Sequence, residues 1–214
     1  MSRYRIAGVS ITETDIVLTL ADGRTLATPI RRYIRVEKAT PSQRLAWALT
    51  DDEHGLNWPA LWAPHPQGMV DVWDILQDAL YEEALGRLKD AGWKVSAITK
   101  RDYELVALWR AEADINNGGF LQFLGNWGED NLLVAIASLE AIGAKEAVRI
   151  LRAMYAVVEP YGQTEEVVSL AELPGLLSEA ERDRLYELDQ AFWAYPDPLS
   201  RLVVEHYGAD AGVP

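Results

Sequence analysis

Amide side chains and glycines gather in one short stretch of the chain, EADINNGGFLQFLGNWGED, which runs from Glu112 to Asp130. The residues in it that could contact a ligand or shape the backbone are Asn116, Asn117, Gly118, Gly119, Phe120, Gln122 and Asn126. Amides bind through hydrogen bonds, whereas catalysis also needs a nucleophile or a proton carrier. No Ser, Thr, Cys, His, Lys or Tyr lies between Ile115 and Asn131. The stretch is therefore a candidate ligand site or structural joint, and a weak candidate for an active site.

A structural joint explains the same residues. Asn and Gly accept the left-handed backbone conformation that ends helices, so the residues 116–119 predict a helix end. Gln122 and Asn126 lie four residues apart, and they could donate to carbonyl groups that the break leaves without partners. The residue types favour the joint over the ligand site.

Carboxylates form two rows at helical spacing. The first row is Asp71, Asp74, Asp78 and Glu82, and the second is Glu179, Asp183 and Glu187. A row of this kind presents about one negative charge per 6 Å, since a helix rises ~1.5 Å per residue, while each DNA strand presents one per ~3.4 Å. Two adjacent rows would approach the charge density of DNA. A solvated outer helix face is the simpler interpretation of each row taken alone.

The net charge of −13 is concentrated in the later part of the chain. Up to Val70, 8 basic and 7 acidic residues give +1, and from Asp71 onward 12 basic and 26 acidic residues give −14. An acidic surface of this kind repels nucleic acid and anionic lipid and attracts basic partners. The sequence thus argues against direct nucleic-acid or membrane binding. It leaves open a basic protein partner, and acidity that serves solubility alone.

Several kinds of site are disfavoured by composition. The chain has no Cys, which excludes disulfides, thiolate metal sites and Cys nucleophiles, and its three histidines lack ligand spacing. No metal or cofactor is predicted. No apolar run approaches the ~18 residues of a membrane span, and strand-like alternation follows the N-terminus where a signal peptide would be apolar, so we expect a cytoplasmic protein. The oligomeric state stays open, including a homodimer.

The chain divides by hydrophobic period into two parts. Residues 1–70 read as a small α+β module, with strands near 4–9, 16–20 and 25–30 and a tight turn at Asp22-Gly23. Thr40-Pro41-Ser42-Gln43 predicts a capping box that opens a short helix to about Leu49. Residues 71–214 read as an all-helical bundle. Its predicted helices lie near 71–89, 101–114, 129–142, 144–158, 178–193 and 198–207.

The later part resembles a known helical family. The motif EADINNGGFLQFLGN, followed by Ala137-Ser138-Leu139-Glu140-Ala141-Ile142-Gly143-Ala144 and Leu188-Asp189-Gln190-Ala191-Phe192, resembles the family of DNA-mimic protein nineteen over about residues 103–207. The resemblance implies an acidic all-helical bacterial protein. The named member of that family is understood to imitate the charge of DNA and to occupy the DNA-binding surface of a transcription factor.

The first part resembles domain of unknown function family 2442. The residues that carry this are Asp22-Gly23-Arg24, Ala39-Thr40-Pro41-Ser42-Gln43-Arg44 and Leu56-Asn57-Trp58-Pro59, over about residues 6–76. The sequence departs from that family after Pro59, where Ala60-Leu61-Trp62-Ala63 replaces an acidic continuation. The resemblance implies a place near toxin-antitoxin genes and no settled chemistry.

Three functions remain as hypotheses. The leading one is a non-enzymatic interaction protein that binds a basic protein surface, such as that of a DNA-binding regulator, through the two carboxylate rows. The second is an antitoxin-like or immunity-like inhibitor of a toxin. The third is an enzyme or small-ligand binder built from Trp58, Trp62 and Trp127 with Asn116, Asn117 and Gln122.

Overall fold

The computed structural model describes residues 2–162 and 172–208. The chain packs as two compact units, of which the first ends at Ala79 and the second begins at Leu80. The predicted division between residues 70 and 71 rests on charge and hydrophobic period rather than packing, and it stays a prediction. No helix in the described ranges is both long enough and apolar enough to cross a membrane.

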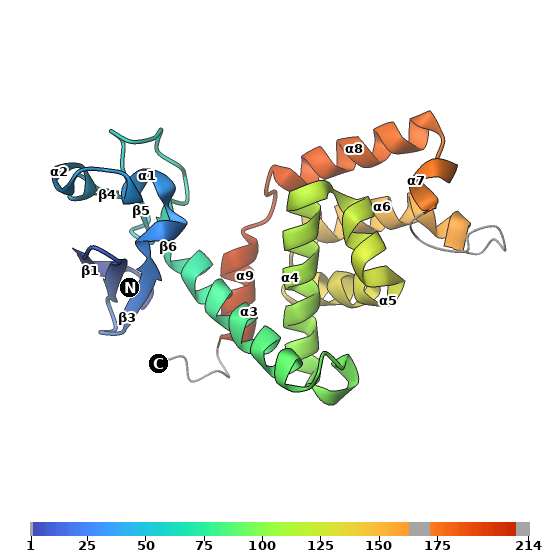
Figure 1. The fold of residues 1–214 in the computed structure, drawn as a ribbon, viewed down its shortest axis with the longest axis horizontal. Helices are drawn as coiled ribbons and strands as arrows, with labels where there is room; N and C mark the ends of the chain where they lie inside the picture. The colour runs from blue at the N-terminus through green and yellow to red at the C-terminus, as the bar shows by residue number, and fades with distance from the viewer. Residues whose placement is uncertain (1, 163–171, 209–214) are drawn as a thin grey trace. The chain divides into compact units, whose positions relative to one another are not determined.

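A three-stranded antiparallel sheet begins the first unit (Figure 1). Its strands are β1 (Ile6–Ile11), β2 (Asp15–Leu20) and β3 (Thr25–Pro29), in that order. The predicted turn forms at Gly23, which has a φ of 86°, and Leu20 N donates to Arg24 O at 2.8 Å. Alternate residues of β2 are buried because strand side chains point to opposite faces.

Short elements complete the first unit. They are the 3-10 turn η1 (Ile30–Arg32), α1 (Ile34–Glu37), α2 (Pro41–Arg44), β4 (Ala48–Leu49), β5 (Gly55–Asn57) and β6 (Val70–Asp71). The capping box at Thr40 is confirmed, but the helix ends at Arg44 and not near Leu49. No residue of α2 is buried, so no apolar face extends it. Ala48 and Leu49 instead pair with β5 in a second three-stranded sheet, which the sequence did not predict.

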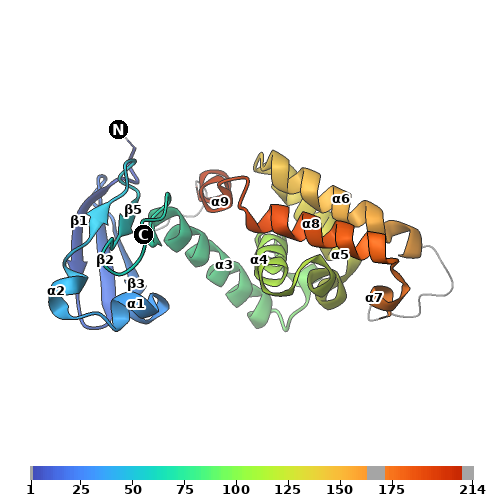
Figure 2. The same cartoon turned by 90° about the horizontal axis from the view of Figure 1, so that it is seen from above.

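The second unit is a helical bundle. Its elements are α3 (Val72–Asp90), which begins in the first unit, η2 (Val95–Ala97), α4 (Lys100–Gly118), α5 (Phe120–Ala141), α6 (Lys145–Gly162), α7 (Leu173–Leu176), α8 (Glu179–Trp193) and α9 (Leu199–Tyr207). α4 packs along α5, α5 against α6, and α6 against α8 (Figure 2). α5 is kinked at Gly128, where φ is 76°, so a short segment precedes the predicted helix at 129–142. The predicted fold class, an α+β module followed by a helical bundle, is confirmed.

Candidate functional site

The Asn-Asn-Gly-Gly segment forms the joint between α4 and α5. α4 ends at Gly118, and Gly119 has a φ of 84° and a ψ of 178°, a conformation open almost only to glycine. Gly119 N donates to Ile115 O at 3.0 Å, as expected of a helix end. The predicted helix stop is confirmed.

α8 holds this joint closed. Asp189 Oδ1 accepts a hydrogen bond of 2.9 Å from Phe120 N, the first backbone donor of α5, and burial raises the pKa of Asp189. Trp193 Nε1 donates to Ile115 O at 2.7 Å, in the last turn of α4. A side chain on Gly119 would place its Cβ 2.5 Å from Asp189 Oδ2. The glycine therefore lets the Asp189 carboxylate approach the start of α5.

Asp189→Ala is expected to lower the free energy of unfolding by about 1–3 kcal/mol, because it leaves the Phe120 N–H without an acceptor. Asp189→Asn keeps an oxygen in the same place and should lose less. Urea denaturation followed by far-ultraviolet circular dichroism measures both. Equal losses for the two variants would show that the hydrogen bond to Phe120 is not what Asp189 contributes.

The side-chain amides after the joint donate to the Asp114 carboxylate and not to unpaired backbone carbonyl groups. Gln122 Nε2 donates to Asp114 Oδ1 at 3.2 Å, and Asn126 Nδ2 donates to Oδ2 at 3.0 Å. Trp127 Nε1 donates to the same Oδ2 at 2.5 Å. The predicted use of the amides was wrong because a carboxylate one turn before the break is a stronger acceptor than a neutral carbonyl. Sequence reasoning gave Asp114 no partner.

The remaining motif residues do not converge on a ligand site. Asn116 and Asn117 are exposed on the last turn of α4, and Phe120 is fully buried in the core. Trp58 is also fully buried and donates to Arg44 O, while Trp62 lies half-exposed under Arg35 in the first unit. The ligand site predicted from these residues therefore has no common cavity in the described part of the chain.

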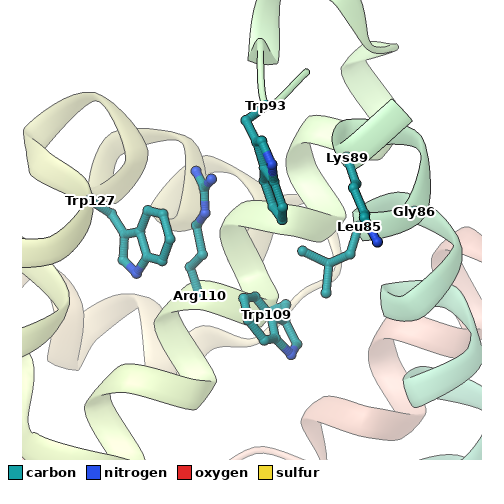
Figure 3. A pocket seen from close by; sticks show the side chains of 7 residues that line it. All are labelled: Leu85, Gly86, Lys89, Trp93, Trp109, Arg110 and Trp127. Carbon is teal, nitrogen blue, oxygen red and sulfur yellow. The ribbon is translucent and has the colours of Figure 1, made fainter. Parts of the chain in front are cut away.

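A pocket does form beside Trp127, which is the one lining residue that the ligand-binding hypothesis had named. It has a volume of about 340 Å³, and Figure 3 shows its lining side chains around a common space. The lining residues are Leu85, Gly86, Lys89, Trp93, Trp109, Arg110 and Trp127. The guanidinium carbon of Arg110 lies 3.8 Å from the centre of the Trp127 ring. Trp at 93, 109 and 127 was the one available signal, but their spacing does not reveal a shared space.

The first predicted carboxylate row is not a continuous exposed surface. Asp71 is only 4% exposed, and its Oδ1 accepts from Trp73 N at 2.7 Å at the start of α3. Asp78 forms an ion pair of 2.6 Å with Arg32. Asp74 and Glu82 are exposed. The predicted exposed row does not include Asp71, because a residue that precedes a helix turns its side chain toward the first backbone N–H groups.

The second predicted row lies on the surface of α8. Glu179, Asp183 and Glu187 are all exposed, and Glu187 pairs with Arg184 at 3.0 Å. The predicted capping box at Ser178 and Glu181 is present. The binding role of both rows stays a prediction.

Arginine and lysine neutralise many other carboxylates of the second unit. The pairs are Arg87 with Glu83 and Asp102, Arg101 with Asp102, Lys100 with Glu104, Arg149 with Glu146, Arg152 with Glu140, Arg184 with Glu187, and Arg201 with Glu205. Exposed pairs stabilise the fold by only about 0.2–1 kcal/mol each. Their larger effect is to cancel the negative charge of these carboxylates locally.

Three carboxylates on or beside the C-terminal half of α6 form no such ion pair within the described residues. Glu129 of α5 accepts a hydrogen bond from Tyr155, and Glu181 of α8 accepts one of 2.9 Å from Tyr161. Glu159 lies one helical turn from Tyr155, and the bond to Glu129 with the charges of Glu129 and Glu159 raises the pKa of Tyr155 to about 12. None of the three carboxylates forms an ion pair with Lys or Arg within the described residues. We call Glu129, Glu159 and Glu181 the α6 acidic group.

Sequence reasoning missed this group because its members come from three helices. Each is a single acid among many, and only the packing shows that Glu129 and Glu181 accept from tyrosines of α6, the helix that carries Glu159. Over the described ranges, no three His, Asp or Glu side chains are arranged to hold a metal ion.

Two family models match the chain. Residues 96–210, more than half of its length, match the model for DMP19-like proteins. The chain belongs to the DMP19-like family. Residues 6–64 of this DMP19-like chain match the model described as protein of unknown function DUF2442. Both resemblances noted from the sequence are thus confirmed, and the second match ends close to the departure at residues 60–63. Neither a curated protein nor a solved structure matches this member of the DMP19-like family.

Proposed function

We propose that this DMP19-like protein is a non-enzymatic interaction protein whose helical unit binds a basic surface of a DNA-binding protein. The observation that carries the proposal is the α6 acidic group, three carboxylates from three helices without Lys or Arg counter-ions among the described residues. A basic partner would supply the missing counter-charges. Family membership and the charge of −14 after residue 70 support the same reading.

Neighbouring acids extend the α6 acidic group. Asp130 follows Glu129 on α5, while Glu179 and Asp183 flank Glu181 on α8, and all three are exposed. The proposed surface thus keeps part of the predicted α8 row, Glu179 and Asp183, and does not depend on Asp71 or Asp78. Tyrosine hydroxyls fix Glu129 and Glu181, which reduces the side-chain entropy that these two carboxylates lose on binding.

Affinity capture with the full chain tests the proposal. The variant Glu129→Gln with Glu159→Gln and Glu181→Gln removes three negative charges and keeps side-chain size, and Gln at 181 still fits a capping box. The matched control is Glu140→Gln with Glu146→Gln and Glu205→Gln, which removes three charges that Arg residues already neutralise. We expect the first variant to lose the captured partner and the control to keep it.

The identity of the partner and its response to salt complete the test. A DNA-binding regulator is expected, and capture of a nuclease or other toxin would instead favour the inhibitor hypothesis. Affinity should fall steeply as salt rises from about 0.01 M to about 1 M, since the Debye length shrinks from about 30 Å to about 3 Å. Equal capture by the two variants, or an affinity that does not change with salt concentration, would contradict the proposal.

A further inference from the structure

The tryptophan pocket, lined by the seven residues of Figure 3, has the size and walls of a small-molecule site. Its volume of about 340 Å³ falls within the roughly 300–1,000 Å³ that is usual for such sites. Indole rings of Trp93, Trp109 and Trp127 supply flat apolar walls (Figure 3). Trp93 is 63% exposed although it is a large apolar residue. These walls favour a ligand with a flat aromatic body.

A buried cation borders the same space. Arg110 is only 9% exposed, and one of its terminal nitrogens donates to Asn131 Oδ1 at 2.8 Å. Its Nε is buried and finds no acceptor anywhere in residues 2–162 and 172–208. A buried donor without a partner costs about 1–3 kcal/mol. One donor of this guanidinium, on a residue that lines the pocket, is thus left without an acceptor.

The charges of the lining select the sign of the ligand. Lys89 and Arg110 are both cationic, and none of the seven lining residues is a carboxylate. Asp114 lies close enough to interact with Arg110, but its oxygens already accept from Gln122, Asn126 and Trp127. A cage that binds ammonium groups needs aromatic faces without competing cations. Lys89 and Arg110 thus line the pocket itself, whereas the nearest carboxylates, Asp114 among them, lie outside its lining.

We propose that the tryptophan pocket binds a small aromatic carboxylate. The aromatic body lies among the three indole rings, and the carboxylate faces Arg110 and Lys89. The site is separate from the α6 acidic group, with which it shares no residue, and it takes a ligand of the opposite charge. Its failure would therefore leave the docking proposal unchanged.

Isothermal titration calorimetry of the full chain with three matched probes tests this site. Indoleacetate is the anion, indoleacetamide its neutral counterpart and tryptamine the cation. We expect indoleacetate to bind at least about tenfold more tightly than indoleacetamide, and tryptamine to bind most weakly. Lys89→Gln, at an exposed position, should reduce the preference for the anion over the amide.

The variant Trp93→Gly removes one wall of the pocket and is expected to leave the fold unchanged. Residue 93 has a φ of 65°, which glycine adopts without strain, so the backbone bond from residue 93 N to Leu88 O should persist. We expect this variant to bind indoleacetate at least about tenfold more weakly. The control is Trp62→Ala, which removes a half-exposed tryptophan of the first unit, whose ring centre lies 3.4 Å from the guanidinium carbon of Arg35. It should bind like wild type.

Four results would overturn the proposal. They are equal affinity for indoleacetate and indoleacetamide, tightest binding of tryptamine, no binding of indoleacetate up to about 10 mM, and unchanged binding by Trp93→Gly.

Discussion

Gly119→Ala is expected to lower the free energy of unfolding by roughly 2–5 kcal/mol, the combined cost of a strained backbone and a broken buried hydrogen bond. A φ of 84° with a ψ of 178° is unfavourable for alanine. The new Cβ would also lie 2.5 Å from Asp189 Oδ2, so the carboxylate must move away from Phe120 N. Urea denaturation followed by circular dichroism provides the measurement.

Two nearby glycines serve as controls. Gly125 lies inside α5 with no atom within 4 Å of an added Cβ, so Gly125→Ala should raise stability by up to about 1 kcal/mol. Gly118→Ala meets the flexible end of Gln122, which can shift at the expense of its bond to Asp114, and it should cost less than Gly119→Ala. If Gly119→Ala were as mild as Gly118→Ala, the joint would not depend on backbone conformation or on Asp189.

Stability is expected to fall by about 2–4 kcal/mol as pH rises from about 4 to about 7, through the ionisation of Asp71. Burial, with a smaller contribution from Asp74, raises the pKa of Asp71 to about 7, against two backbone hydrogen bonds that lower it. Between the unfolded pKa and the folded pKa, the native state holds a proton that the unfolded state has released. Rising pH therefore favours unfolding until the native carboxyl also ionises, and the loss is complete above about pH 7.

Asp71→Asn should remove this loss. The amide oxygen still accepts from Trp73 N, so the variant should match wild type near pH 4 and exceed it above about pH 7 by about 2–4 kcal/mol. Denaturation across this pH range is the measurement. Asp51→Asn, at an exposed position of the same unit, is the control for the loss of one charge. Parallel profiles for wild type and Asp71→Asn would contradict the raised pKa.

Much of the local structure could be predicted because its causes lie in neighbouring residues. Gly23 permits the hairpin turn, Thr40 and Gln43 form a capping box, and Gly119 ends a helix through its own backbone freedom. Each prediction depends on residues within a few positions of one another. The motif of an acid, Asn-Gly-Gly-Phe, Gln and Asn likewise identified the DMP19-like part. Its residues are close together in the sequence, so the motif can be identified without knowing which residues they contact in the fold.

The structure showed that one predicted site residue, Asp71, is buried, a fact that spacing could not reveal. Asp71 and Asp74 have the same residue type at helical spacing, yet one is buried at the start of α3 and the other is exposed. The difference arises because an acid that precedes a helix bonds its N–H groups, while an acid one turn later faces solvent. Spacing alone therefore predicted one continuous row of exposed carboxylates, whereas packing buries its first member.

The sequence by itself determined the fold class, the helix break and the excess of negative charge, since composition and local backbone preference are properties of contiguous residues. Tertiary structure alone decided which carboxylates stay without counter-ions and which tryptophans share a pocket. Glu129 and Glu181 contact tyrosines of α6, and Trp93 and Trp127 line one pocket with Arg110, only because helices distant in sequence pack together. Charge neutralisation and cavity shape depend on distances between such side chains, and these distances are set by the packed core.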